Sequence, residues 1–211
     1  MIRIVTVERE YGCGGGEIAQ RLADRLGWKL WDQLLTEEIA RLANCPTAVV
    51  ERREERTDPL YYRLFKSFLR GSYEGSLNAH KLKLADSEGI LKFTEIVVQQ
   101  AASAGNCVIV GRGSQLYLRS RPDAMRVFLY VPREDKVKRL LARGKSQNEA
   151  QELVDTVDLE RADFIEKYFK VEWPSRSVYH TMINTAIGDP AVVQTIVDFI
   201  KTLESQSKAQ E

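Results

Sequence analysis

A run of glycines near the start of the chain has the composition of an anion-binding turn. The residues are, in order, Gly12, Cys13, Gly14, Gly15, Gly16 and Glu17. They follow a β-branched run and precede apolar residues at helical spacing, so backbone N–H groups and the positive end of a helix dipole converge there. Glycine is needed because a Cβ would block phosphate oxygens and restrict positive φ angles. The alternative is a tight turn without a ligand.

The pattern alone does not select the anion. A dinucleotide-binding turn needs Gly-x-Gly-x-x-Gly and an acidic residue about 20 positions later. Gly12 and Gly14 begin that pattern and Asp32 stands near the acidic position, but Glu17 occupies the place of the third glycine. A P-loop needs a lysine where Gly15 stands. Neither fingerprint is complete.

A second candidate is Arg112, which lies between two glycines directly after the strand-like residues 107–110. An arginine at the end of a strand can grip a phosphate with its planar guanidinium fork. The alternative is a surface arginine in a turn.

A basic helical segment followed by an Asp-x-x-Arg pair is the third candidate. Its charged residues are Arg133, Lys136, Lys138, Arg139, Arg143 and Lys145, followed by Asp158, Arg161 and Lys167. Asp158 and Arg161 are three residues apart, so they share a helix face and can pair. Phosphoryl transfer needs cations that close over the spreading charge and exclude water. A solvated helix face is the alternative.

Strands alternating with helices must position these groups. Apolar runs predict strands at 2–7, 28–32, 107–110, 125–132 and 180–186. A first helical pattern has Ile18, Leu22 and Leu26 four residues apart and is ended by Gly27, and further helical patterns lie at 33–43, 89–105, 133–144, 146–170 and 189–203. This order predicts an α/β fold with a parallel sheet and helices on both faces. Ligands of such sheets bind at the carboxyl ends of the strands, where both glycine turns fall.

Composition favours one globular domain over residues 1–203, with a disordered tail at 204–211. The 211 residues are 44% hydrophobic and 29% charged, which is ordinary for a globular protein. A formal net charge of +1 gives no reason to expect nucleic-acid or membrane partners. Three scattered cysteines indicate a reducing compartment. Because we also find no signal peptide and no long apolar segment, we expect a cytoplasmic protein.

No metal site is predicted from side chains. His80 and His180 are isolated, with no carboxylate or cysteine at ligand spacing.

The sequence resembles the cytidylate kinase-like family, relatives of the bacterial cytidylate kinases. The stretch "REYGCGGGEIAQRLADRLG", with "WDQLL" after it, carries the resemblance, since the family has "REYGSGG" in place of the ordinary P-loop. The segments "VIVGRG", "VFLYVP", "DLERADFIEKYF" and "HTMINTA" then follow in the matching order.

The resemblance implies a P-loop kinase fold of the nucleoside monophosphate kinase type, with a five-stranded parallel sheet. A helical monophosphate-binding insertion would span about 33–88 and a lid about 143–175. It also implies transfer of the γ-phosphoryl group of ATP, with Mg²⁺, to CMP or a related nucleoside monophosphate.

The resemblance also assigns roles to the candidate residues. The loop from Gly12 to Gly16 would cradle the donor phosphates, with Asp32 near the acceptor nucleotide and Arg112 on the acceptor phosphate. Asp158 and Arg161 would match the lid's Asp-x-x-Arg, with Arg161 nearest the transferred group.

Three departures from the family pattern bear on turnover. Gly16 stands where members often carry a basic residue, Glu17 replaces a hydroxyl residue that would bind Mg²⁺, and Gly113 replaces an aspartate. The P-loop lysine is absent as well, as is common in this subfamily. A carboxylate at position 17 can bind the metal or favour the helix N-terminus. Arg9 is the candidate to supply the missing charge. Two alternatives stay open: a catalytically weakened nucleotide-binding protein, and a small-molecule kinase with a different acceptor.

Overall fold

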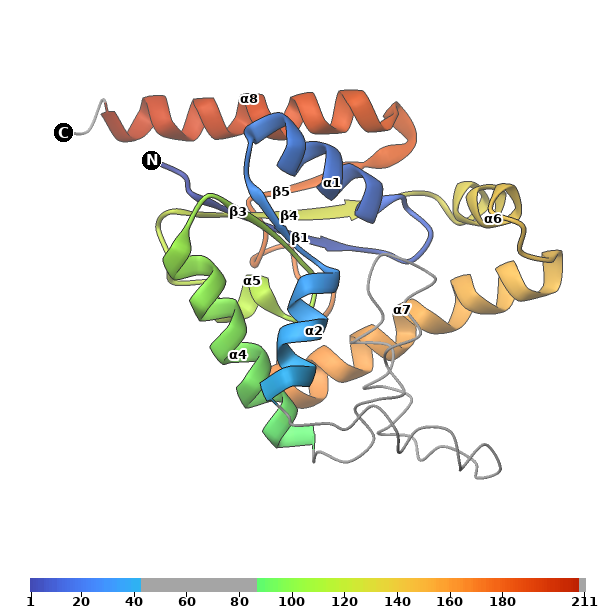
Figure 1. Ribbon diagram of the computed structural model, residues 1–211. Helices are drawn as coiled ribbons and strands as arrows, with labels where there is room; N and C mark the ends of the chain where they lie inside the picture. Colours follow the sequence, from blue (N-terminus) through green and yellow to red (C-terminus); the bar gives the residue numbers. More distant parts are fainter. Residues whose placement is uncertain (43–86, 209–211) are drawn as a thin grey trace.

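The computed structural model describes residues 1–42 and 87–208, built around a five-stranded sheet in the order β2-β3-β1-β4-β5 (Figure 1). The strands are β1 (Ile4–Arg9), β2 (Lys29–Trp31), β3 (Cys107–Val110), β4 (Ala124–Tyr130) and β5 (Thr181–Asn184). Every pairing between them is parallel. The predicted α/β fold with a parallel sheet is therefore confirmed.

Helices connect the strands and cover both faces of the sheet. They are α1 (Gly15–Leu26), α2 (Gln33–Leu42), α4 (Ser87–Ala104), α5 (Ser114–Tyr117), α6 (Arg133–Ala142), α7 (Gln147–Phe169) and α8 (Asp189–Lys208), with a 3-10 turn η3 (Thr185–Ile187). In Figure 1, α1 and α8 lie on one side of the sheet, and α2, α4, α5 and α7 on the other. Within the two described ranges, none of these helices is long and apolar enough to cross a membrane.

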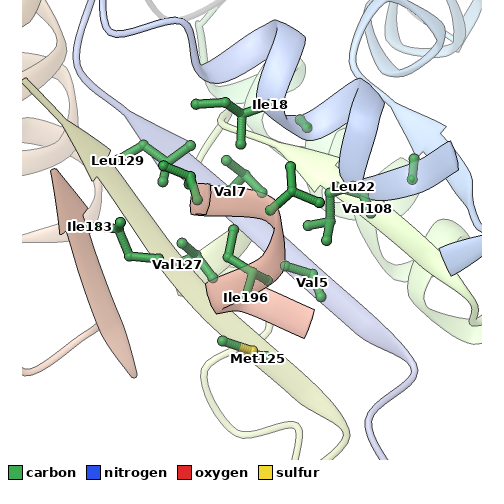
Figure 2. Close-up of a cluster of buried hydrophobic side chains, with 14 of the residues drawn as sticks. Val5, Val7, Ile18, Leu22, Val108, Met125, Val127, Leu129, Ile183 and Ile196 are labelled. Carbon is green, nitrogen blue, oxygen red and sulfur yellow. The ribbon is translucent and has the colours of Figure 1, made fainter. Parts of the chain in front are cut away.

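The central strand β1 is buried along its whole length because apolar layers cover both of its faces. Val5 and Val7 pack with Leu22 of α1 and Ile196 of α8 (Figure 2). Ile4 belongs to the opposite layer, which includes residues of α2, α4 and α7. This division follows from the alternation of side chains along a strand. Each fully buried Leu or Ile side chain contributes roughly 1.5–3 kcal/mol, so the two layers make a rigid base for the loops.

The strand register brings the three candidate segments to one edge of the sheet. Val7 of β1 is level with Val110 of β3, and Arg9 is level with Leu129 of β4. The chain leaves these three strands at neighbouring points. The glycine loop, the Arg112 turn and the start of α6 therefore lie together, although Gly16 and Gly111 are 95 positions apart in the sequence.

One predicted boundary is wrong. The chain from 204 to 208 is not a disordered tail, because α8 continues to Lys208. The carboxylate of Glu204 accepts a hydrogen bond from the Ile2 backbone N–H at 3.0 Å, which ties the end of α8 to the chain before β1. Residues 209–211, and residues 43–86 of the predicted monophosphate-binding insertion, lie outside the described residues.

Candidate functional site

The glycine loop turns the chain from β1 into α1 through left-handed backbone. Gly12 has φ +75° and Gly14 has φ +81°, which residues with a Cβ rarely adopt. Helix α1 begins at Gly15, and its N-cap residue Gly14 makes no side-chain capping bond. Since the first N–H groups of a helix have no intrahelical acceptor, this end of α1 is suited to an anion.

Two donors fix the orientation of the loop at the Cys13 carbonyl. It accepts hydrogen bonds from the Thr185 hydroxyl at 2.8 Å and from the Arg139 guanidinium. Because a trans peptide directs its C=O and N–H oppositely, this anchoring turns the Gly14 N–H away from both donors. A Cβ at position 14 would lie 2.0 Å from Nη1 of Arg139 and would displace this end of the arginine side chain, and the positive φ of Gly14 itself favours glycine.

The side chain of Cys13 does not face a ligand site. It is fully buried in the apolar layer that contains Val7 and Ile18. Burial raises the pKa of its thiol to about 12, so the group is protonated and unreactive at neutral pH. Only the backbone of Cys13 takes part in the loop.

A first hollow of about 300 Å³ lies over the glycine loop. The predicted site residues that line it are Arg9, Gly12, Gly14, Gly15, Gly16, Glu17 and Arg161. Glu10, Tyr11 and Arg143 complete the lining. Backbone amide groups and arginines thus surround a space next to a helix N-terminus, which is the chemistry of a phosphate site.

An ion pair joins two residues of this lining. Nη2 of Arg143, just after α6, lies 2.5 Å from Oε1 of Glu17 in the first turn of α1. Both side chains are partly exposed, 32% and 46%, so the pair contributes little to stability and can be exchanged for a ligand. Glu17 is therefore within reach of a bound cation, at the cost of its contact with Arg143.

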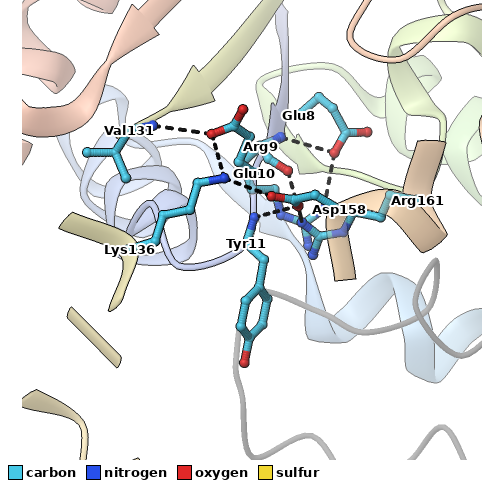
Figure 3. Close-up of polar contacts among 8 residues, drawn as sticks. All are labelled: Glu8, Arg9, Glu10, Tyr11, Val131, Lys136, Asp158 and Arg161. Atoms are coloured by element: carbon cyan, nitrogen blue, oxygen red, sulfur yellow. Dashed lines mark hydrogen bonds and ion pairs between the residues drawn. The ribbon is translucent and has the colours of Figure 1, made fainter. Parts of the chain in front are cut away.

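Asp158 of α7 holds the chain that enters the glycine loop (Figure 3). Its carboxylate accepts a hydrogen bond from the Tyr11 N–H at 2.8 Å and ion pairs from Lys136 at 2.9 Å and Arg161 at 3.2 Å. Lys136 also pairs with Glu10 at 2.9 Å. Burial alone would lower the pKa of Lys136, but the carboxylates of Asp158 and Glu10 together have the larger effect. The pKa of Lys136 is therefore raised. Asp158 lines neither this hollow nor the second one beside it, but it contacts Tyr11 and Arg161, which line the first.

Arg161 connects α7 to the end of β1. Its Nη1 donates a hydrogen bond to the backbone carbonyl of Arg9 at 3.0 Å (Figure 3). The side chain is buried, and burial followed by the nearby charge of Arg9 lowers its pKa. Because the charge of Arg9 acts on Arg161, an anion beside the two guanidinium groups would stabilise both.

A second hollow of about 230 Å³ lies beside the first and shares Arg9 and Arg161 with it. Glu8, Arg112, Ile165 and Trp173 complete its lining. The indole Nε1 of Trp173 is buried there and has no hydrogen-bond partner among residues 1–42 and 87–208. Buried polar donors are normally paired, so this N–H is available to an acceptor on a ligand.

Arg112 is held in a strained turn at the second hollow. Gly111, Arg112 and Gly113 all have positive φ, of 64°, 57° and 68°. A non-glycine residue in this region is uncommon, and such strain often occurs at ligand sites. Nη1 of Arg112 lies 3.5 Å from Oδ1 of Asp32. Asp32 itself lines neither hollow, so its contact with the site is through Arg112. Burial lowers the pKa of Arg112 to about 10, which leaves it charged at neutral pH.

The glycine in place of the family's aspartate has a steric explanation. A Cβ at position 113 would lie 2.8 Å from Cζ of Phe169, at the end of α7. The aromatic ring of Phe169 therefore fills the space that an aspartate side chain would enter.

Several polar residues at the site were missed at the sequence level: Glu10 and Tyr11 line the first hollow, Glu8 lines the second, and Gln115 contacts Glu8. Glu8 is buried at the end of β1, and its Oε2 accepts a hydrogen bond from Nε2 of Gln115 at 3.1 Å. The one available signal was a charged pair, Glu8 and Arg9, closing a run of β-branched residues. Gln115 carries no sequence signal, because a glutamine in a short helix is ordinary.

No metal-binding cluster of three or more His, Cys, Asp or Glu residues occurs in the described part of the chain. Glu10 and Glu17 are the carboxylates in the first hollow. Mg²⁺ in phosphate sites is commonly bound by one or two carboxylates together with the phosphates, so this lining fits such an ion only with a phosphate ligand.

Comparisons with known proteins agree with this geometry. The sequence model of the cytidylate kinase-like family matches residues 4–187 of this chain. The chain superposes on an uncharacterized protein from Eubacterium ventriosum with TM-score 0.69, at 20% identity over 96% of this chain and 99% of that one. Shikimate kinase from Bacteroides thetaiotaomicron gives TM-score 0.54 at 13% identity, over 95% and 99% of the two chains. Shikimate kinase from Acinetobacter baumannii in complex with shikimate gives 0.53 at 19% identity, over 96% and 94%. The fold is thus that of the P-loop kinases. No curated protein matches the sequence.

Proposed function

Since the chain belongs to the cytidylate kinase-like family, we propose that it is an ATP-dependent nucleotide kinase, which transfers the γ-phosphoryl group of ATP to CMP or a related nucleoside monophosphate. One observation carries the proposal: two neighbouring hollows share the buried arginines Arg9 and Arg161. A donor in one hollow and an acceptor in the other would place the transferred group beside both guanidinium groups.

The first hollow is the proposed donor site. The loop from Gly12 to Gly16 and the start of α1 offer backbone N–H groups to the donor phosphates. ATP supplies the phosphoryl group, and Mg²⁺ neutralises part of the phosphate charge when bound. Glu17, released from Arg143, is the proposed ligand of the ion.

The second hollow is the proposed acceptor site. Arg112, oriented by Asp32, would hold the acceptor's phosphate from one side. Arg161 is held by Asp158 and by the Arg9 carbonyl, so it needs little reorganisation to stabilise the charge on the transferred group. Catalysis is then positional and electrostatic, with no covalent intermediate on the protein.

Two observations support the alternatives. The ion pair of Glu17 with Arg143 and the glycine at position 15 favour a catalytically weakened nucleotide-binding protein. The second hollow contains the carboxylate of Glu8, which can accept a hydrogen bond from a ligand. An acceptor with a hydroxyl group fits this feature, which favours a small-molecule kinase.

A coupled assay of ADP release separates the three functions. Nucleoside monophosphates and small hydroxy acids such as shikimate are each offered with Mg-ATP, and calorimetry measures Mg-ATP binding in parallel. We expect turnover with CMP. Turnover with a hydroxy acid alone would favour the small-molecule kinase, and tight Mg-ATP binding without any turnover would favour the weakened protein.

A further inference from the structure

Compared with the P-loop pattern, this chain has a cation where the pattern has a glycine, and a glycine where the pattern has its lysine. In Gly-x-x-x-x-Gly-Lys, with Gly14 as the second glycine, the first glycine corresponds to Arg9 and the lysine to Gly15. The motif has therefore lost its cation at one position and gained one at another.

These two positions are in contact in space. A Cβ added to Gly15 would lie 2.8 Å from both Cβ and Cγ of Arg9. Those atoms are the inner part of the side chain, so they cannot swing aside. The stem of Arg9 thus occupies the space into which a side chain at position 15 would extend.

A second glycine makes room for the Arg9 head group. A Cβ at Gly111, at the end of β3, would lie 2.0 Å from Nη1 of Arg9 and 3.0 Å from Cζ. The guanidinium therefore packs on the backbone at Gly111, next to both hollows.

A buried carboxylate holds Arg9 in this position. Oε1 of Glu8 accepts a hydrogen bond from the Arg9 backbone N–H at 3.0 Å and lies 3.4 Å from Nη1. Gln115 donates to the other oxygen of Glu8. With 4% of its surface exposed, Arg9 is held in place rather than free to sample solvent.

We propose that Arg9 takes the place of the P-loop lysine, as the cation that contacts the donor phosphates through the space that Gly15 leaves open. Its planar fork can bind two phosphate oxygens through two parallel N–H···O bonds, whereas a lysine ammonium acts as a point charge without that fixed geometry. This inference rests on the proposed kinase function. It follows that Arg9 and a side chain at position 15 exclude each other.

Calorimetry of Mg-ATP binding to the full chain tests the charge. Arg9→Met keeps the stem of the side chain and removes its charge, and Arg9→Lys keeps both. We expect Arg9→Met to weaken Mg-ATP binding about 10- to 100-fold, as for loss of a charge-assisted contact, and Arg9→Lys to recover most of it. The control is Arg21→Met on the exposed face of α1, which should leave the affinity within about threefold. Thermal unfolding shows that each variant is folded.

A second experiment moves the positive charge from position 9 back to position 15, where the P-loop pattern has its lysine. Gly15→Lys alone should lower both the melting temperature and Mg-ATP affinity, because its side chain meets Arg9. Combining it with Arg9→Gly removes the clash and should bind Mg-ATP at least about tenfold more tightly than Arg9→Met. If the double variant does not fold, the contrast between Arg9→Met and Arg9→Lys decides.

Three results would overturn the inference. Equal affinities of wild type and Arg9→Met would do so, as would a folded double variant that binds no better than Arg9→Met, or Arg9→Lys and Arg9→Met that bind alike. Failure of the wild-type protein to bind Mg-ATP would overturn the proposed function as well, so the two failures are distinguishable.

Discussion

The carboxylate of Asp158 accepts a hydrogen bond from the backbone N–H of Tyr11 at 2.8 Å, across 147 residues of the chain. Tyr11 directly precedes the glycine loop, and Asp158 lies on α7 within the predicted lid. This bond therefore couples the position of the lid helix to that of the loop over which the donor phosphates are proposed to bind.

The two acidic residues of α7 that pair with α6 allow a matched test of this coupling. Asp158 pairs with Lys136, with side chains 16% and 10% exposed, whereas Asp155 pairs with Arg133 at 54% and 53% exposure. We expect Asp158→Asn to lower the free energy of unfolding by about 1–3 kcal/mol, because it weakens a buried network. Asp155→Asn should leave it nearly unchanged. Urea denaturation measures both, and equal losses would contradict the assignment.

Loss of the Arg112 side chain should weaken binding of the acceptor more than binding of ATP. Arg112→Ala removes the guanidinium from the second hollow but leaves the glycine loop intact. We expect KM for the acceptor to rise at least about tenfold while the Kd for Mg-ATP stays within about threefold. Steady-state kinetics and calorimetry give the two values. Equal loss of acceptor use and ATP binding would count against an acceptor role.

At position 113, the destabilisation caused by the contact with Phe169 can be measured separately from that caused by the positive φ. Gly113 and Gly27 both have φ +68°, but a Cβ would meet Phe169 at position 113 and nothing within 4 Å at position 27. We expect Gly113→Ala to be more destabilising than Gly27→Ala, by about 1–3 kcal/mol of overpacking. In a Phe169→Ala background, Gly113→Ala should cost less stability than it does in the wild type, because the ring that its Cβ meets is gone. Equal melting temperatures of the two single variants would refute the contact.

The fold followed from local patterns in the sequence. Runs such as Val5 to Val7 and Val108 to Val110 predict buried strands, and the apolar spacing of Ile18 and Leu22 predicts α1. The end of α8 could not be predicted in this way, because residues 204–208 are polar. Their order depends on a tertiary contact, the hydrogen bond of Glu204 with Ile2.

Less of the candidate site than of the fold could be predicted from the sequence. The sequence identified Arg112 in one segment and the pair Asp158 and Arg161 in another, but it gave no sign of the contact between Asp158 and Tyr11. The pairing of Arg9 with Gly15 was equally hidden, because it depends on where a glycine leaves space. Glu8 was missed because a carboxylate at a strand end is identified as buried only once α5 covers it.

Stability should depend on pH through His180. Its Nδ1 accepts a hydrogen bond from the Arg126 backbone N–H at 3.0 Å, which requires that nitrogen to be unprotonated. Burial, and then the charge of Arg126, lower the pKa of His180 below 6.5. The folded state thus binds fewer protons than the unfolded state between the two pKa values. The stabilisation is complete above pH 6.5 and is lost as the pH falls through the folded pKa.

The check is urea denaturation at pH 7.5 and at pH 5.0. We expect the wild-type protein to be more stable at the higher pH, and His180→Gln to reduce that difference. His80→Gln serves as the control for loss of a histidine. An unchanged pH dependence in His180→Gln would refute the role of this residue.

The central claim is that the two hollows bind a phosphate donor and a phosphate acceptor side by side, across Arg9 and Arg161. Calorimetry with adenosine and cytidine joined 5′ to 5′ by five phosphates tests it most directly, because one such molecule spans both sites. We predict that this compound binds at least about tenfold more tightly than ATP, since occupation of the second site becomes intramolecular. Binding no tighter than that of ATP would contradict the claim.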